Sequence, residues 1–218
     1  MTLVICWLCF KQTSSVIASL NFYGAKNYIE QWENRKEAPD AKQLSIAHEY
    51  AASAVNSHSS LALYTDTLST VLQWQALFDN DAKKNNDLLN AAEKLNMQSV
   101  INRPAWPVTW ANLAYIKWLK GEVDSTFSRY LNNASLYGPN NPDVHKAVAQ
   151  FGLLMAKKDV RKFLQHKDII SKHVVQGLSN PRSQEPIIET IVNTGTLTLV
   201  CQWLCESSAS VRNKVKCR

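Results

Sequence analysis

The segment from Trp106 to Met155 constrains the fold of this chain more than any other part of the sequence. It holds two apolar series separated by one glycine: Trp110, Leu113, Ala114, Gly121, Phe127, Tyr130 and Ala134. Residues three and four positions apart share one face of an α-helix. A glycine between two such series is typical of a sharp turn, because glycine adopts the left-handed backbone conformation without strain. The segment therefore predicts two antiparallel helices joined at Gly121.

The spacing of this unit indicates its class. The glycine stands eleven positions after Trp110, and the next helix is expected at Pro142, 34 positions after the expected first start at Val108. This length, with Trp, a small residue and a turn glycine in order, is the pattern of a tetratricopeptide repeat. We therefore predict an all-α fold, a tetratricopeptide-like helix-turn-helix stack that is α-solenoid-like. The residues expected to be buried in it are Trp110, Leu113, Ala114, Phe127 and Tyr130.

The remaining sequence shows the same helical periodicity. We expect helices after Asp40 and Ser60, a break at 79–81, a helix that ends before Pro104, one that closes near Gly177, and short helices at 184–193 and 197–205. Terminal units of a helical stack are commonly atypical because they cap it. We divide the chain into an N-terminal apolar segment with a lead-in helix, residues 1–35, and a helical-repeat domain with C-terminal capping helices, residues 36–218.

The first 23 residues leave the start of the chain open to three interpretations. They begin with an apolar stretch, residues 1–10, which Lys11 and four polar residues then interrupt. A helix that spans a bilayer needs about 20 mostly apolar residues, and neither a basic leader nor a cleavage site is evident. The alternatives are a weak uncleaved membrane anchor, a soluble start, and a misassigned gene start.

Composition excludes several classes of protein. Apolar residues make up 45% and charged residues 19% of the chain, with only 6 Gly and 7 Pro, which favours a globular helical protein over a disordered or many-turned β-protein. The net charge is +6, and clustered basic residues would suit nucleic acid because they neutralise phosphates. Here they are dispersed, so we expect a solvated basic surface and no nucleic-acid partner.

Five cysteines raise the question of redox chemistry. Cys6 and Cys9 have C-x-x-C spacing, but they lie in an apolar run with no histidine nearby, so we interpret them as small apolar side chains. Near the C-terminus, a disulfide between Cys217 and either Cys201 or Cys205 would tie down a basic tail in an oxidising compartment. Free thiols in a reducing compartment are the alternative.

The sequence contains no recognisable catalytic motif. A phosphate-binding glycine loop, G-x-S-x-G and H-E-x-x-H are all missing from it. His166 and His173 are seven positions apart and could share a helix face, but no third ligand is evident, so we interpret them as solvent-facing. We therefore predict no enzyme activity, no cofactor and no bound metal.

The best candidate surface is rich in aromatic and basic residues. Trp106 lies between two prolines, in a segment that cannot be regular helix because proline restricts the preceding residue. A lysine at position 117 can lay its stem along the core and present its charge at the surface. Aromatic faces beside cations suit a peptide, a helix or an acidic glycan. The candidate partner-binding residues are Arg103, Trp106, Lys117 and Lys120.

One run of residues carries a family resemblance. Arg103-Pro-Ala-Trp-Pro-Val-Thr-Trp-Ala-Asn-Leu-Ala-Tyr-Ile-Lys117 resembles the signature of the VpsP-like family of bacterial exopolysaccharide-biosynthesis proteins. The resemblance continues through residues 121–124 and 137–139 and covers most of the chain from about residue 40. The chain departs from the family at Asn141, where members tend to carry Trp-Glu, and at residues 56–60, which lack the usual Pro-Gly-Asn turn.

The resemblance implies an envelope-associated helical accessory that is not a glycosyltransferase. It would support exopolysaccharide biosynthesis or export as a non-catalytic scaffold that binds proteins of the polysaccharide assembly machinery. Direct polysaccharide binding is the first alternative and an unrecognised enzyme the second. The implied location is the bacterial cell envelope, periplasmic or membrane-associated through the N-terminus, and a cytoplasmic location stays open.

Overall fold

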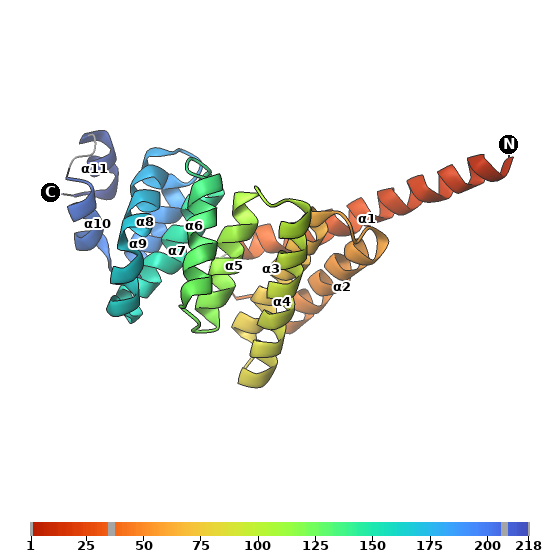
Figure 1. Ribbon diagram of the computed structural model, residues 1–218, viewed down its shortest axis with the longest axis horizontal. Coiled ribbons are helices and arrows are strands. Elements are labelled where there is room, and N and C mark those ends of the chain that lie inside the picture. The colour runs from red at the N-terminus through yellow and green to blue at the C-terminus, as the bar shows by residue number, and fades with distance from the viewer. Residues whose placement is uncertain (1, 35–37, 206–208, 218) are drawn as a thin grey trace. The chain divides into compact units, whose positions relative to one another are not determined.

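The computed structural model describes residues 2–34, 38–205 and 209–217, and these ranges fold into helices without a β-strand. The helices in chain order are α1 (Thr2–Asn34), α2 (Ala41–Ser57), α3 (Ala62–Phe78), α4 (Ala82–Asn102), α5 (Pro107–Leu119), α6 (Ser125–Tyr137), α7 (Pro142–Lys158), α8 (Val160–Ser179), α9 (Gln184–Thr194), α10 (Leu197–Trp203) and α11 (Ala209–Val215) (Figure 1). The predicted all-α class is confirmed.

The chain divides into two compact units, residues 1–104 and 105–218. Unit 1 contains α1 to α4, and unit 2 contains α5 to α11. The boundary falls at Pro104, in the short segment between α4 and α5. The division at residue 35 that we drew from the sequence follows a change in composition, whereas this one follows the packing of the backbone.

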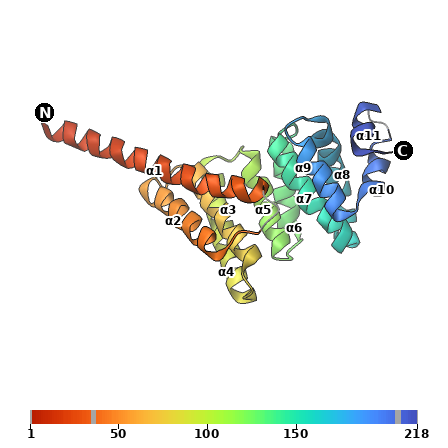
Figure 2. The same ribbon diagram turned by 180° about the vertical axis from the view of Figure 1, so that it is seen from behind.

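Unit 1 is held together by small residues that let long helices approach. Figure 2 shows α1 beside α2, and α3 packs against α4. One apolar cluster joins α1, α2 and α3: Ala25, Ile29, Trp32, Leu44, Ala47, Ala51 and Val71. Trp32 contacts Trp74 of α3 with ring centroids 5.5 Å apart. Burial of such side chains contributes about 1.5–3 kcal/mol each, so the cluster fixes this part of the unit.

Helix boundaries in unit 1 follow local side-chain chemistry. Asp40 caps α2: its carboxylate accepts from the Gln43 backbone N–H at 2.7 Å, and the Gln43 side chain accepts from the Asp40 N–H. Asp81 caps α4 in the predicted break. The predicted cap at Ser60 is wrong, because α3 begins at Ala62 and is preceded by Leu61, which makes no side-chain capping bond.

Unit 2 consists of two helix pairs and a C-terminal group. α5 packs against α6 and α7 against α8; α9 covers α7 and α8, and α10 contacts α8, α9 and α11. Four of the five side chains expected in this core are buried, namely Leu113, Ala114, Phe127 and Tyr130. Trp110 is only partly buried, and its ring lies 5.8 Å from that of Tyr130.

The turns of unit 2 also match the sequence chemistry. Gly121 has φ +75°, the left-handed conformation that a side chain would strain. Asp124 and Asn141 cap α6 and α7, and Pro142 occupies the first turn of α7. The helix expected to close near Gly177 continues to Ser179, and the one expected at 197–205 ends at Trp203.

Across the described residues, none of the helices combines the length and the apolar character needed to cross a bilayer. The side chains of residues 1–14 lie outside the described part of the structure, and with them the environment of Cys6 and Cys9.

Candidate functional site

Trp106 occupies the position that the sequence predicted for it. It is the residue before α5, with φ −82° and ψ 107°, an extended conformation. Its side chain is 45% exposed. An aromatic side chain fixed in a proline-bounded turn loses little entropy when it makes a contact, which suits an anchor.

Lys117 and Lys120 lie together at the end of α5, where they share an acidic partner. Both ammonium groups pair with the Glu122 carboxylate, Lys120 at 3.3 Å, and Lys117 also pairs with Asp124 at 3.3 Å. Lys117 is buried, with only 7% of its surface exposed. The two lysines therefore face two carboxylates of the α5–α6 turn, and the local charge is balanced within the turn.

The pKa values in this turn reflect these pairs. Burial lowers the pKa of Lys117, but hydrogen bonds to Glu122 and Asp124 outweigh it, so the net shift is upward. The Lys117 hydrogen bond lowers the pKa of Glu122. The Phe127 backbone N–H lowers the pKa of Asp124, with Lys117 adding to the effect. All these groups stay charged at neutral pH.

Arg103 belongs to unit 1, whereas the other three candidate residues belong to unit 2. Its guanidinium pairs with the Asp66 carboxylate of α3 and lies 3.4 Å from the Ser99 hydroxyl. The structure thus brings Lys117 and Lys120 together and gives Arg103 a partner in its own unit. The candidate partner-binding surface stays a prediction.

The remaining aromatic residues of the segment pack within unit 2. Tyr115 stacks against Trp118, with ring centroids 5.8 Å apart, and against Phe151 of α7 at 6.4 Å. Burial raises the pKa of Tyr115 to about 12. Phe151 also meets Phe127 edge to face at 5.9 Å. These rings contribute to the core. Among the aromatic residues from Trp106 to Tyr130, Trp106 is the exposed one.

The interpretation of His173 as solvent-facing is wrong. Its side chain is fully buried and forms a hydrogen bond with His145 of α7, Nδ1 to Nδ1, at 2.8 Å. His166 is partly buried, with its ring 4.9 Å from that of Phe127. The pair could not be recognised from spacing within one helix, because its members belong to α7 and α8. The sequence did contain a signal for the pair. His145 and His173 are equally far from Asp159, the turn between α7 and α8, so they lie at the same level of the two antiparallel helices.

A shallow depression of ≈ 440 Å³ lies beside His145 of this pair. Its lining is uncharged at neutral pH: Asn140, His145, Val175, Gln176, Ser179, Asn180 and Pro181. Two buried polar atoms here have no hydrogen-bond partner, Nε2 of His173 and Oε1 of Gln176. Within the described ranges, no cluster of three or more His, Cys, Asp or Glu residues is arranged to hold a metal ion.

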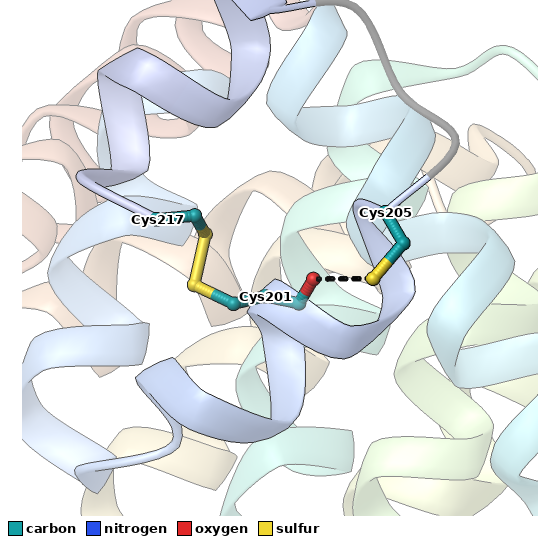
Figure 3. Close-up of a disulfide and its surroundings, with 3 residues drawn as sticks. All are labelled: Cys201, Cys205 and Cys217. Atoms are coloured by element: carbon teal, nitrogen blue, oxygen red, sulfur yellow. Dashed lines mark hydrogen bonds between the residues drawn. A yellow bond between two sulfur atoms is a disulfide. The ribbon is translucent and has the colours of Figure 1, made fainter.

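The cysteine alternatives at the C-terminus are resolved by the structure. Cys201 of α10 and Cys217 form a disulfide with a Cα–Cα distance of 5.5 Å. Figure 3 shows Cys205 apart from the two bonded sulfurs, with its thiol donating a hydrogen bond to the Cys201 carbonyl oxygen at 3.6 Å. Cys205 is a free, exposed thiol.

A second exposed surface lies on α1. Four large apolar side chains at one-, three- and four-residue steps are at least half exposed: Val16 (58%), Ile17 (50%), Leu20 (67%) and Tyr23 (62%). The opposite face of the same helix is buried through Ala18, Phe22 and Ala25. We call the four exposed residues the α1 stripe. An exposed apolar patch of this kind is a candidate interaction surface.

Unit 1 also has a small groove of ≈ 220 Å³ between the ends of α2, α3 and α4. Phe78 lies at its edge, 42% exposed and stacked on Trp74 with an interplanar angle of 3°. The polar groups beside it are already engaged: Gln75 with His48 at 3.1 Å, and Asp79 with Lys84.

No protein-family model matches the chain, and no curated protein matches it.

Proposed function

We propose that this chain is a non-catalytic helical scaffold that supports bacterial exopolysaccharide biosynthesis or export by binding other proteins of the assembly machinery. The observation that carries the binding role is the α1 stripe. Leu20 and Tyr23 are exposed to water on a helix whose other face is packed, which favours their burial against another protein. The polysaccharide context is supported only by the sequence resemblance, which is clearest over residues 103–117.

The partner surface that suits the α1 stripe is another helix. Side chains three and four positions apart form ridges that fit between the ridges of a second helix. Val16, Leu20 and Tyr23 have this spacing. A helix of a partner protein would therefore cover them along their length, with the polar residues of α1 at the rim.

The finer fold assignment is part of the same proposal: α5 to α8 form two tetratricopeptide-like units. α5 begins at Pro107 and α7 at Pro142, 35 positions apart, and α6 at Ser125 and α8 at Val160 have the same spacing. The repeat is one residue longer than the sequence suggested, because Pro107 itself occupies the first helical position. The equal spacing of the two pairs supports their assignment as stacked repeats, in which each unit packs against its neighbour.

A location in the cell envelope is supported by the Cys201–Cys217 disulfide, since such bonds persist in oxidising compartments. Labelling of thiols in intact cells tests this point. A periplasmic chain has Cys205 open to a membrane-impermeant maleimide without lysis, and labelling only after lysis would contradict an external location.

The function is tested by complementation of a deletion strain. Leu20→Lys places a charge in the centre of the α1 stripe, and we expect polysaccharide output to fall while helicity and expression stay unchanged. The matched control is Lys26→Ala, an exposed residue of α1 that lies outside the stripe, six positions after Leu20. Full output from Leu20→Lys would contradict the proposed role of the stripe.

Direct polysaccharide binding is the second candidate, and exposed Trp106 favours it. In this case Trp106→Ala removes retention on immobilised polysaccharide without lowering the melting temperature, and Lys117→Ala weakens retention. If Trp106→Ala unfolds the protein and Lys117→Ala changes nothing, the surface around them has a structural role only.

A further inference from the structure

We propose that the His145–His173 pair is an acid-sensitive latch between α7 and α8, which opens the end of unit 2 near the depression when both imidazoles take up a proton. The latch is independent of the proposed scaffold function. It rests on the position of the two rings, their burial and the hydrogen bonds that each protonation state allows.

The neutral pair has one hydrogen bond available. With the two Nδ1 atoms 2.8 Å apart, one Nδ1–H donates and the other Nδ1 accepts. Whichever ring donates, Nε2 of His173 stays buried without a partner. The rings are 1% and 0% exposed for His145 and His173. The neutral pair is thus stable, but it contains an uncompensated polar atom that makes any added charge costly.

The first proton leaves the hydrogen bond in place. It goes to His145, because this ring borders the depression, whereas His173 does not. His145 then carries hydrogen on both nitrogens and donates Nδ1–H, so Nδ1 of His173 must accept and the remaining His173 proton sits on Nε2. The pair now has one fixed arrangement with a single positive charge.

The second proton breaks the bond. Both Nδ1 atoms then carry hydrogen and face each other at hydrogen-bond distance, so two donors meet and no acceptor lies between them. Two positive charges also share a buried site, which stabilises neither. The rings must separate, and the contact that joins α7 to α8 at this level is lost.

Within the described part of the chain, the charged side chain that acts on both rings does not offset this charge. Lys172 of α8 acts on both rings with the same sign, and the lining of the depression is uncharged. On α7, Asp143 is engaged by Lys146 at 2.7 Å. α9 presents Ile187, and a methyl group on Gly177 would lie 2.3 Å from its Cδ1 and 2.8 Å from His145 Cβ.

The packing determines what opens. Gly177 brings the α8 backbone against both His145 and Ile187, so α8 and α9 are positioned by the same contact. Separation of the rings therefore loosens residues 173–190, at the end of α8 and the start of α9, and widens the depression.

The direction of the pH effect follows from linkage. Burial lowers the pKa of His145, and it lowers that of His173 from 6.5 to about 4. The unfolded or opened state binds protons first, so the latch is fully stable above about pH 6.5 and weakens progressively as the pH falls toward about 4.

Hydrogen exchange on the full-length protein tests the latch. Between pH 7 and pH 4.5, after correction for intrinsic rates, we expect amides in residues 173–190 to exchange about tenfold faster or more, while α5 and α6 keep their protection. His173→Asn places an amide where Nδ1 lies, which can still bond to His145 but takes up no second proton. It should remove most of the acid response.

His166→Asn is the matched control: burial lowers the pKa of this histidine of α8 too, but its ring contacts Phe127 and not the pair, so the variant should keep the acid response of residues 173–190. Equal protection of the wild type at both pH values, or a full acid response in His173→Asn, would overturn the latch. If His173→Asn does not fold, an NMR titration of the wild-type imidazoles decides: titration of either ring at its ordinary pKa contradicts the proposal.

Discussion

Gly152 of α7 lies directly against Ile170 of α8: a methyl group on Gly152 would stand 2.6 Å from Ile170 Cγ2. Ile170 is fully buried, so it has no room to move away. The two helices therefore approach at a distance that only glycine permits at this position, and the pair depends on it.

We expect Gly152→Ala to destabilise the protein by about 1–3 kcal/mol, because the added methyl overpacks the contact between α7 and α8. Chemical denaturation of the purified protein measures this. In combination with Ile170→Ala the two effects should couple, with the double variant losing less than the two single variants together. An unchanged denaturation midpoint for Gly152→Ala would show that the helices are further apart than described.

The disulfide should stabilise the C-terminal end of unit 2. It closes a loop with a sequence separation of 16, and a loop of this size contributes up to about 3 kcal/mol in the chain-entropy account. We expect Cys217→Ser to lower the melting temperature and to increase proteolysis around α11. Cys205→Ser is the control, since Cys205 has a free thiol.

Reductant provides the complementary measurement for the disulfide. It should lower the melting temperature of the wild type and of Cys205→Ser, and have no effect on Cys217→Ser. A melting temperature of the wild type that is insensitive to reductant would contradict a stabilising role for the bond.

Tyr115 should make the protein sensitive to alkali. Its pKa is raised from 10.0 to about 12 by burial, so the folded state keeps the phenol proton over a range in which the unfolded state loses it. Stability from this group is complete below about pH 10 and is lost as the pH rises toward about 12. We expect Tyr115→Phe to lose less stability between pH 9 and pH 11 than the wild type, with Tyr137→Phe, at an exposed position, as the control.

Lys117→Met should change stability little at pH 7, by less than about 1 kcal/mol, because Glu122 and Asp124 are about half exposed and water can replace the lysine. The effect should depend on pH. Lys117 lowers the pKa of Glu122 and contributes to the lowered pKa of Asp124, so the stability from these pairs is present above the ordinary carboxyl pKa and lost in acid. Thermal melts from pH 7 to pH 3 should therefore show a smaller acid loss in Lys117→Met, and an identical profile would contradict the ion pairs.

The fold class could be predicted because each element has its own local signal. Asp40, Asp81, Gly121 and Pro142 mark helix boundaries through capping or turn chemistry, and such signals act within a few residues. The prediction that Ser60 caps α3 was wrong, because a serine before an apolar run is a cap only if its side chain reaches the N–H groups of the helix. The division at Pro104 could not be predicted, since it depends on which helices pack together.

The candidate site was less predictable for a related reason. The position of Trp106 follows from its two neighbouring prolines, but the partners of Lys117 lie beyond the turn and depend on how the turn folds. His145 and His173 come together only once the α7–α8 hairpin forms. The α1 stripe was hidden in the sequence because α1 is apolar on two faces, and only packing shows which of them is covered.

Site-specific photo-crosslinking in living cells is the most direct test of the scaffold account. A photoreactive amino acid at position 20 lies in the centre of the α1 stripe, and one at position 26 lies on the same helix outside the stripe, six positions after Leu20. The account predicts a discrete crosslink from position 20 to a protein of the polysaccharide assembly machinery, identified by mass spectrometry, and none from position 26. No protein adduct at position 20, or the same adducts from both positions, would contradict it.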